Sequence, residues 1–128
     1  MKITVGIPTH NEENTIIACI ESIMNQKINL ELEIIIVASG CTDNTVENVK
    51  NYIMKHKNVR LIVEDKRKGK ISALNKILKE SEGEIIIHTD GDVVLESTAI
   101  ARIIKHFNNK EVVGVSGRAH FLNNISRP

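Results

Sequence analysis

Two aspartates separated by a glycine, Asp90-Gly91-Asp92, form the pattern in this sequence that is best suited to binding a cation. Carboxylates two residues apart can face one hard cation and a bound diphosphate, because the glycine lets the backbone turn between them. Oxygen ligands of this kind suit magnesium or manganese. A turn carrying two solvated acids is the simpler alternative, but the motif follows an apolar run, Ile85 to Ile87, which favours the cation site.

A dense run of positive charge, Lys66-Arg67-Lys68-Gly69-Lys70, is the second candidate. Phosphates bound near a cation need such charges, together with the free N–H groups at the start of a following helix. The run is not a Walker A loop, because Ile71 follows Lys70 and Glu64 stands where the first glycine would be. The dinucleotide motif GxGxxG is also absent, so NAD and FAD are not expected. A solvated cationic loop is the alternative.

Two polar segments complete the set of candidates, Pro8-Thr9-His10-Asn11-Glu12 and Ser39-Gly40-Cys41-Thr42-Asp43. The second predicts either a helix cap, at Thr42 or Asp43, or one wall of a nucleoside pocket. Asn11 and Glu12 are equally suited to starting a helix and to hydrogen bonding a base and a ribose. His10 lies beside them, where it could contact a ligand. No GxSxG motif is present.

These candidates lie between short apolar runs that alternate with segments of helical periodicity. Two of the apolar runs do not alternate with polar residues, which is typical of strands buried on both faces. Pro8 is expected to end the first strand. We predict strands at 2–7, 32–38, 59–63, 84–89, 111–116 and 118–122, and helices at 14–26, 45–56, 70–79 and 97–107.

Alternating strands and helices predict an α/β fold of three layers (α/β/α), in which helices cover both faces of a mainly parallel sheet. We expect one domain over residues 1–128. In open sheets of this kind, ligands bind outside the carboxyl ends of the strands. All four candidate segments follow predicted strands, so we expect them to converge at one rim of the sheet.

The composition disfavours several classes of partner. The 17 basic and 16 acidic residues nearly cancel, at a net charge of +1, so no global field attracts nucleic acid or an acidic membrane. Aromatic residues make up 2% of the chain and Trp is absent, which disfavours stacking of single-stranded nucleic acid. Cys19 and Cys41 form no CxxC pattern, and Cys19 falls in an apolar helical pattern typical of a small core residue.

No targeting or membrane segment is expected. The longest apolar run, Ile34 to Ala38, is far too short to span a bilayer, and the apolar start of the chain breaks at Pro8. We therefore expect a cytoplasmic domain, at the cytoplasmic face of the membrane if the protein has a membrane-associated remainder. An exposed sheet edge after 111–116 would allow a homodimer.

Four segments together resemble the N-terminal, nucleotide-sugar-binding half of family 2 glycosyltransferases, which have the Rossmann-like GT-A fold. Each segment is a weak signal alone, but their order and spacing are similar to those of the family over nearly the whole chain. The segments are Val5 to Glu12, Ile35 to Thr45, Lys68 to Asn75 and Thr89 to Asp92.

The resemblance implies a donor of the UDP, GDP or TDP type and an inverting transfer to a glycan or lipid hydroxyl. It implies that Asp92 is the principal ligand of Mn2+ or Mg2+, that Asp90 approaches the ribose or the metal-bound diphosphate, and that Asp43 lies beside the base. The nucleotide-sugar-binding residues that we predict are Pro8, His10, Asn11, Glu12, Ser39, Asp43, Arg67, Lys68, Gly69, Lys70, Asp90, Gly91 and Asp92.

Two features depart from the family pattern. The family often has two acids where this chain has Ala38-Ser39, and an acid there commonly contacts uracil, so GDP and TDP stay as open as UDP. The catalytic base of the family normally follows a point that matches Pro128, so we expect the chain alone to transfer sugar weakly or not at all. A stand-alone nucleotide-binding module and a nucleotidyltransferase remain as alternatives.

Overall fold

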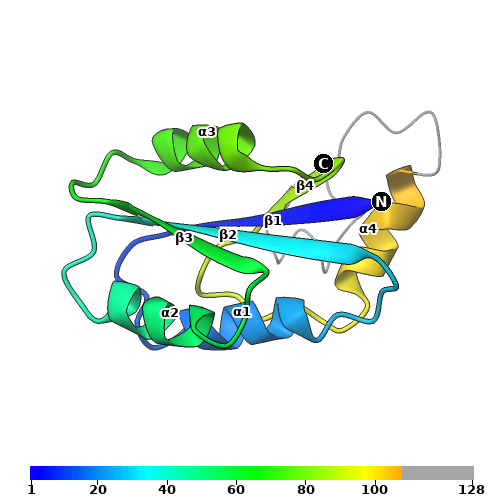
Figure 1. The fold of residues 1–128 in the computed structure, drawn as a ribbon, viewed down its shortest axis with the longest axis horizontal. Coiled ribbons are helices and arrows are strands. Elements are labelled where there is room, and N and C mark those ends of the chain that lie inside the picture. Colours follow the sequence, from blue (N-terminus) through cyan, green and yellow to red (C-terminus); the bar gives the residue numbers. More distant parts are fainter. Residues whose placement is uncertain (108–128) are drawn as a thin grey trace.

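A computed structural model describes residues 1–107 of the chain as four strands that alternate with four helices (Figure 1). The predicted strands at 111–116 and 118–122, and the dimer edge expected beside them, lie outside the described residues. Among residues 1–107, no helix is both long and apolar enough to span a bilayer. The elements are β1 (Lys2–Thr9), α1 (Ile16–Met24), β2 (Glu31–Ser39), α2 (Thr45–Ile53), β3 (Val59–Glu64), α3 (Lys70–Glu80), β4 (Ile85–His88) and α4 (Ala99–Phe107).

The four strands form one parallel sheet in the order β3-β2-β1-β4, as the alternation of strands and helices predicts. From β1 the chain adds β2 and then β3 on one side, and it returns across β1 to add β4 on the other. The direction of winding therefore reverses between β1 and β4. In open α/β sheets, the crevice at such a reversal is where ligands bind.

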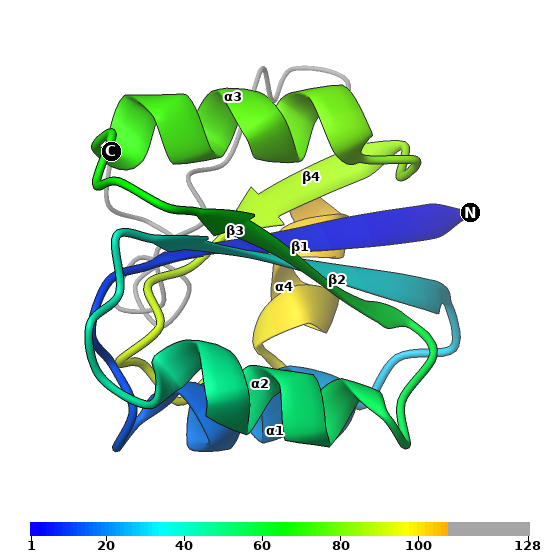
Figure 2. The ribbon, with the colours of Figure 1, turned by 60° about the vertical axis from the view of Figure 1, so that its left-hand side comes forward.

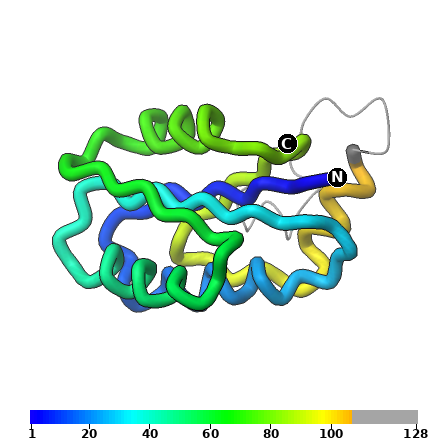
Figure 3. Tube along the Cα trace, viewed as in Figure 1, coloured from blue at the N-terminus to red at the C-terminus, as the bar shows by residue number. Residues whose placement is uncertain are grey.

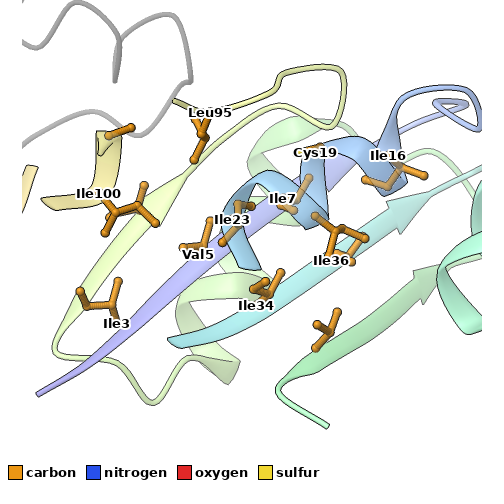
Figure 4. Packing of buried hydrophobic residues seen from close by; sticks show 14 of the residues in the cluster. Ile3, Val5, Ile7, Ile16, Cys19, Ile23, Ile34, Ile36, Leu95 and Ile100 are labelled. Atoms are coloured by element: carbon orange, nitrogen blue, oxygen red, sulfur yellow. The ribbon is translucent and has the colours of Figure 1, made fainter. Parts of the chain in front are cut away.

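Helices cover both faces of the sheet, so the predicted three layers are confirmed (Figure 2). The core on one side joins the sheet to α1, α2 and α4, and the smaller core on the other joins it to α3. Neighbouring residues of β2 enter opposite cores: Ile34 and Ile36 face the first, Ile35 and Val37 the second. Cys19 is fully buried in the larger core, as expected, among isoleucines of the sheet and of the helices packed on it (Figure 4).

Pro8 lies inside β1, which is a correction to the prediction that it ends the strand. It pairs with Val37 of β2. On the other side, the carbonyl of Gly6 accepts a hydrogen bond from the N–H of Thr89, so the polar groups of even-numbered residues in β1 face β4. Pro8 follows two residues later, beyond the last residue of β4, where the N–H that proline lacks has no strand to meet.

Helix α3 lies close to β1 because position 6 has no side chain. A Cβ atom on Gly6 would come 2.5 Å from Cγ2 of the fully buried Ile77. No relaxed side-chain contact is that short, so only glycine permits this approach. The close packing fixes α3, and with it the segment that precedes it, over the end of β1.

We predict that Gly6→Ala lowers the free energy of unfolding by about 1–3 kcal/mol, because the added methyl group overpacks the contact with Ile77. Urea unfolding of the variant measures this loss. In an Ile77→Ala background the same substitution should cost much less, since the three nearest atoms all belong to that side chain. Equal losses in both backgrounds would contradict the explanation.

Candidate functional site

The segments that follow the four strands enclose one open cavity of about 220 Å³. The chain leaves β1, β2 and β3 at the left-hand end of the view in Figure 3. Eight of the thirteen predicted residues line the cavity, and at least one comes from each of the four segments. The lining residues are Pro8, Thr9, His10, Glu12, Ser39, Arg67, Gly69, Lys70, Ala73 and Asp90.

Thr9 and Ala73 also line the cavity, although neither is among the predicted binding residues. Thr9 is buried, and its hydroxyl donates a hydrogen bond to Oε1 of Glu12 at 2.7 Å. Ala73 is a buried residue of α3, and its small side chain leaves room beside the end of the sheet. Thr9 directly follows Pro8 within a candidate segment, so its place at the cavity could have been predicted. The place of Ala73 depends on how α3 packs and could not.

Asn11 holds two loops together instead of lining the cavity. It has a positive φ of 50°, a conformation that asparagine tolerates better than most residues. Its Oδ1 atom accepts hydrogen bonds from the backbone N–H groups of Thr42 (2.7 Å) and Asp43 (3.3 Å). Helix α1 begins after Thr15, so Asn11 does not cap it either.

Asp43 also connects the loops, but the predicted helix cap at Thr42 or Asp43 is wrong, because Asn44 is the N-cap residue of α2. Its carboxylate accepts hydrogen bonds from the N–H and hydroxyl of Thr45, at the start of α2, and from the N–H of Glu13 at 3.2 Å. Burial acts to raise the pKa of Asp43, but these hydrogen bonds outweigh it and hold the pKa below its ordinary value. Asp43 does not line the cavity.

His10 connects the ends of β1 and β2 across the cavity. Its ring Nδ1–H donates to the backbone carbonyl of Ser39 at 2.7 Å. The other ring nitrogen, Nε2, lies 3.4 Å from the side-chain amide of Asn11, as expected if it accepts a hydrogen bond there. His10 therefore combines a lining position with a fixed ring orientation.

The turn at Asp90 to Asp92 rests on α1. Gly91 is buried, and a Cβ atom there would come 2.8 Å from Oε1 of Glu12. The Thr15 hydroxyl donates to the Gly91 carbonyl at 3.1 Å, and the Cys19 thiol donates to the Asp90 carbonyl at 3.4 Å. Burial raises the pKa of Cys19 to about 12, so the thiol keeps the proton that it donates.

Three carboxylates share this rim. Glu12 is partly buried, and burial raises its pKa, with further contributions from the negative charges of Asp92 and Asp90. Asp90 forms an ion pair with Lys70 at 3.0 Å, whereas the exposed Asp92 has no hydrogen bond or ion pair within residues 1–107. Gly91 lies in contact distance of Glu12, so the predicted meeting of this turn with the loop after β1 is observed.

No three acidic, histidine or cysteine side chains of the described chain converge closely enough to hold a metal ion by themselves. Magnesium, however, commonly takes only one or two carboxylates from a protein and completes its shell with phosphate oxygens and water. Asp90 and Asp92 provide this partial set of oxygens. The donor chemistry of the turn therefore fits a hard divalent cation that a phosphorylated ligand helps to bind.

The basic run divides between two faces. Arg67, Gly69 and Lys70 line the cavity, and Lys70 is the first residue of α3. The side chain of Lys68 instead lines a shallow groove on the outer side of α3. The start of a helix attracts anions through its free N–H groups and its dipole, so the end of α3 at the cavity suits phosphate.

Comparison with known proteins adds a family to this geometry. The model of the family described as "Glycosyl transferase family 2" matches residues 4–127. The chain is 33% identical over 129 residues to a dolichyl-phosphate beta-glucosyltransferase of Trichomonas vaginalis, covering 91% of this chain and 38% of that protein. The chain therefore spans well under half the length of this relative.

Solved structures with the same fold contain nucleotide sugars. A mannosyltransferase of Pyrobaculum calidifontis, in complex with GDP-Man and Mn2+, matches with a TM-score of 0.80 and 32% identity over 86% of this chain and 33% of that chain. S. aureus TarS, in complex with UDP-GlcNAc, matches with a TM-score of 0.74 and 26% identity over 84% of this chain and 31% of that chain. These matches confirm the GT-A fold and disfavour the nucleotidyltransferase alternative.

We predict that Glu12→Gln stabilises the chain at neutral pH relative to the wild type. A raised pKa means that the folded state disfavours the charged form, so wild-type stability falls as pH rises from the ordinary pKa of a glutamate through the raised value. Gln keeps an oxygen that can accept the Thr9 hydrogen bond and cannot ionise. Urea unfolding from acid to neutral pH measures the difference between the two proteins.

The exposed Glu21 of α1 provides the matched control, because Glu21→Gln removes the same charge from the surface of the helix. This substitution should leave the pH dependence of wild-type stability nearly unchanged. A stability difference between wild type and Glu12→Gln that does not vary with pH would contradict the prediction.

Proposed function

Because the chain belongs to glycosyl transferase family 2, we propose that its cavity binds the donor of the transfer, a nucleoside-diphosphate sugar. One observation carries the proposal: an acidic turn and a basic helix start, 20 residues apart in sequence, line the same cavity and meet there in an ion pair (Lys70 Nζ to Asp90 Oδ1, 3.0 Å). A diphosphate with its cation carries both signs of charge and matches both walls.

The acidic turn is proposed to bind the cation, with Asp92 as the principal ligand and Asp90 as the second. Support comes from the two carboxylates on one turn and from the Mn2+ in the mannosyltransferase that shares this fold. Mn2+ and Mg2+ both suit these oxygens. When bound, the cation would neutralise charge on the departing nucleoside diphosphate.

The basic wall is proposed to bind the phosphates. Lys70 and Arg67 supply positive charge, and the start of α3, which lines the cavity, supplies free N–H groups. In the absence of a ligand, Lys70 and Asp90 neutralise each other. Binding would replace this pair by two others, in which Lys70 meets a phosphate and Asp90 approaches the cation.

The part of the cavity between the loops that follow β1 and β2 is proposed to bind the nucleoside. Pro8, His10, Glu12 and Ser39 line the cavity from these loops. Asn11 and Asp43 contribute indirectly, because their hydrogen bonds set the distance between the two loops. The relatives bind both guanosine and uridine donors, so the base stays open among UDP, GDP and TDP.

The reaction is proposed to be an inverting transfer. A hydroxyl of a glycan or lipid acceptor attacks the anomeric carbon, the bond from that carbon to the diphosphate oxygen breaks, and the acceptor proton passes to a general base. The residues that line the cavity orient the bound donor for this displacement. The acceptor and the general base are assigned to parts of the protein other than the residues described here.

We expect calorimetry to detect binding of at least one of UDP, GDP and TDP to the folded chain, and the binding to depend on Mn2+ or Mg2+. Asp92→Asn should abolish the metal-dependent part of the affinity and leave the circular dichroism spectrum unchanged, because this side chain is exposed and makes no contact that the fold needs.

The control is Glu96→Gln, which neutralises another exposed acid four residues along the chain. Its nucleotide affinity should equal that of the wild type. Failure of all three nucleotides to bind would contradict the proposed donor site. Unchanged metal dependence in Asp92→Asn would contradict only the choice of metal ligand.

The 128-residue chain alone is expected to bind donor but to transfer sugar poorly, because the residues described here hold a donor cavity without an assigned general base. Release of nucleoside diphosphate, with and without candidate glycan and lipid acceptors, measures this. Robust multiple turnover by the isolated chain would contradict this expectation and show that a general base lies within its 128 residues.

A further inference from the structure

A buried glutamate at the end of β3, Glu64, has no part in the donor site as proposed. The residue is 3% exposed and does not line the cavity. Its Oε2 atom accepts hydrogen bonds from the ammonium group of Lys76 at 2.9 Å and from the hydroxyl of Ser72 at 3.0 Å, both on α3. Its Oε1 atom has no hydrogen-bond partner within residues 1–107.

Glu64 is charged despite its burial. Burial acts to raise its pKa, but the hydrogen bonds from Lys76 and Ser72, together with the positive charge of Lys76, hold the pKa below its ordinary value. A buried charge is costly unless its partners keep their positions. The carboxylate therefore constrains where the first turns of α3 can lie relative to the end of β2.

The backbone of Glu64 is connected to the basic loop, which we define as residues 66–69. Glu64 pairs in register with Ser39, whose Oγ atom accepts a hydrogen bond from the backbone N–H of Lys68 at 3.1 Å. The backbone carbonyl of Glu64 also accepts a hydrogen bond from the N–H of Gly40 at 2.8 Å. Glu64 thus contacts both sides of the basic loop, through its backbone on the side of β2 and through its carboxylate on the side of α3.

The loop backbone lies directly on Gly40. This glycine has a φ of +57°, and a Cβ atom there would come 2.5 Å from the backbone nitrogen of Arg67. Such a close approach fixes the height of the loop above the end of β2. Arg67, on this backbone, and Lys70, at its junction with α3, are the two cations that line the cavity.

We infer that Glu64 is a positioning residue for the basic loop: its buried carboxylate holds the start of α3, and its backbone holds the end of β2, so that Arg67 and Lys70 face the donor cavity. The positioning of the loop stands independently of the ligand, whereas its effect on nucleotide affinity rests on the proposed function. Glu64 does not contact the donor, because the cavity does not reach its side chain.

Limited trypsin digestion of the full chain tests the position of the loop, since Lys66, Arg67 and Lys68 are all cleavage sites. Glu64→Gln keeps the shape of the side chain and removes its charge. We expect cleavage in the basic loop to become roughly tenfold faster, as for the loss of one charge-assisted hydrogen bond. Amide hydrogen exchange at Lys68 should accelerate as well, while the amides of β1 and β2 keep their protection.

Asp65→Asn is the matched control, because it removes the same charge from the exposed neighbouring residue. Its cleavage rate should equal that of the wild type. If Glu64→Gln does not fold, Ser72→Ala removes a single hydrogen bond to the carboxylate and retains the ion pair with Lys76, and it should accelerate loop cleavage by a smaller factor.

Calorimetry with UDP, GDP and TDP in the presence of Mn2+ tests the consequence for binding. Glu64→Gln should weaken the affinity measured for the wild type roughly tenfold, and Asp65→Asn should not change it. Equal loop cleavage in wild type and Glu64→Gln would overturn the inference whatever the affinities. If the wild type binds no nucleotide, the proposed function fails and the cleavage and exchange rates alone decide the role of Glu64.

Discussion

Parallel pairing of β1 with β2 and with β4 is the interaction on which the site depends. Because neighbouring strands run in the same direction, every loop that follows a strand leaves from the same edge of the sheet. The reversal of winding between β1 and β4 then places a crevice at this edge, the usual position of a ligand in open sheets of this kind. A polar cavity forms at this edge although the interior beneath it is almost entirely isoleucine, valine and alanine.

The residues around the cavity divide into those that face it and those that hold it. The side chains of Asn11 and Asp43 accept hydrogen bonds from backbone groups of neighbouring loops. Glu12, Asp90 and Lys70 instead place charged groups at the rim. The first group lowers the energy of the folded chain. The second includes like charges held close together, an arrangement that costs stability and is typical of binding sites.

Much of the fold could be predicted because it follows from local patterns. Apolar runs such as Ile34 to Val37 indicate a doubly covered strand, and parallel strands bring their following loops together. The remaining features depend on contacts between distant residues. The role of Asn11 requires knowledge of the loop after β2, and the burial of Glu64 requires Lys76, twelve residues away, to turn inward on α3. In sequence, Glu64 resembles the start of an exposed charged loop.

The proline in β1 explains, through the backbone N–H that it lacks, why the cavity opens at this place. A parallel ladder extends only while each new residue offers a donor, and residue 8 offers none on the side of β4. Hydrogen bonding between β1 and β4 therefore cannot continue past Pro8, and the segments that follow the two strands are not held together by backbone pairing. The opening therefore does not rely on any particular side chain, so the surrounding residues can diversify to accept new ligands without sealing it.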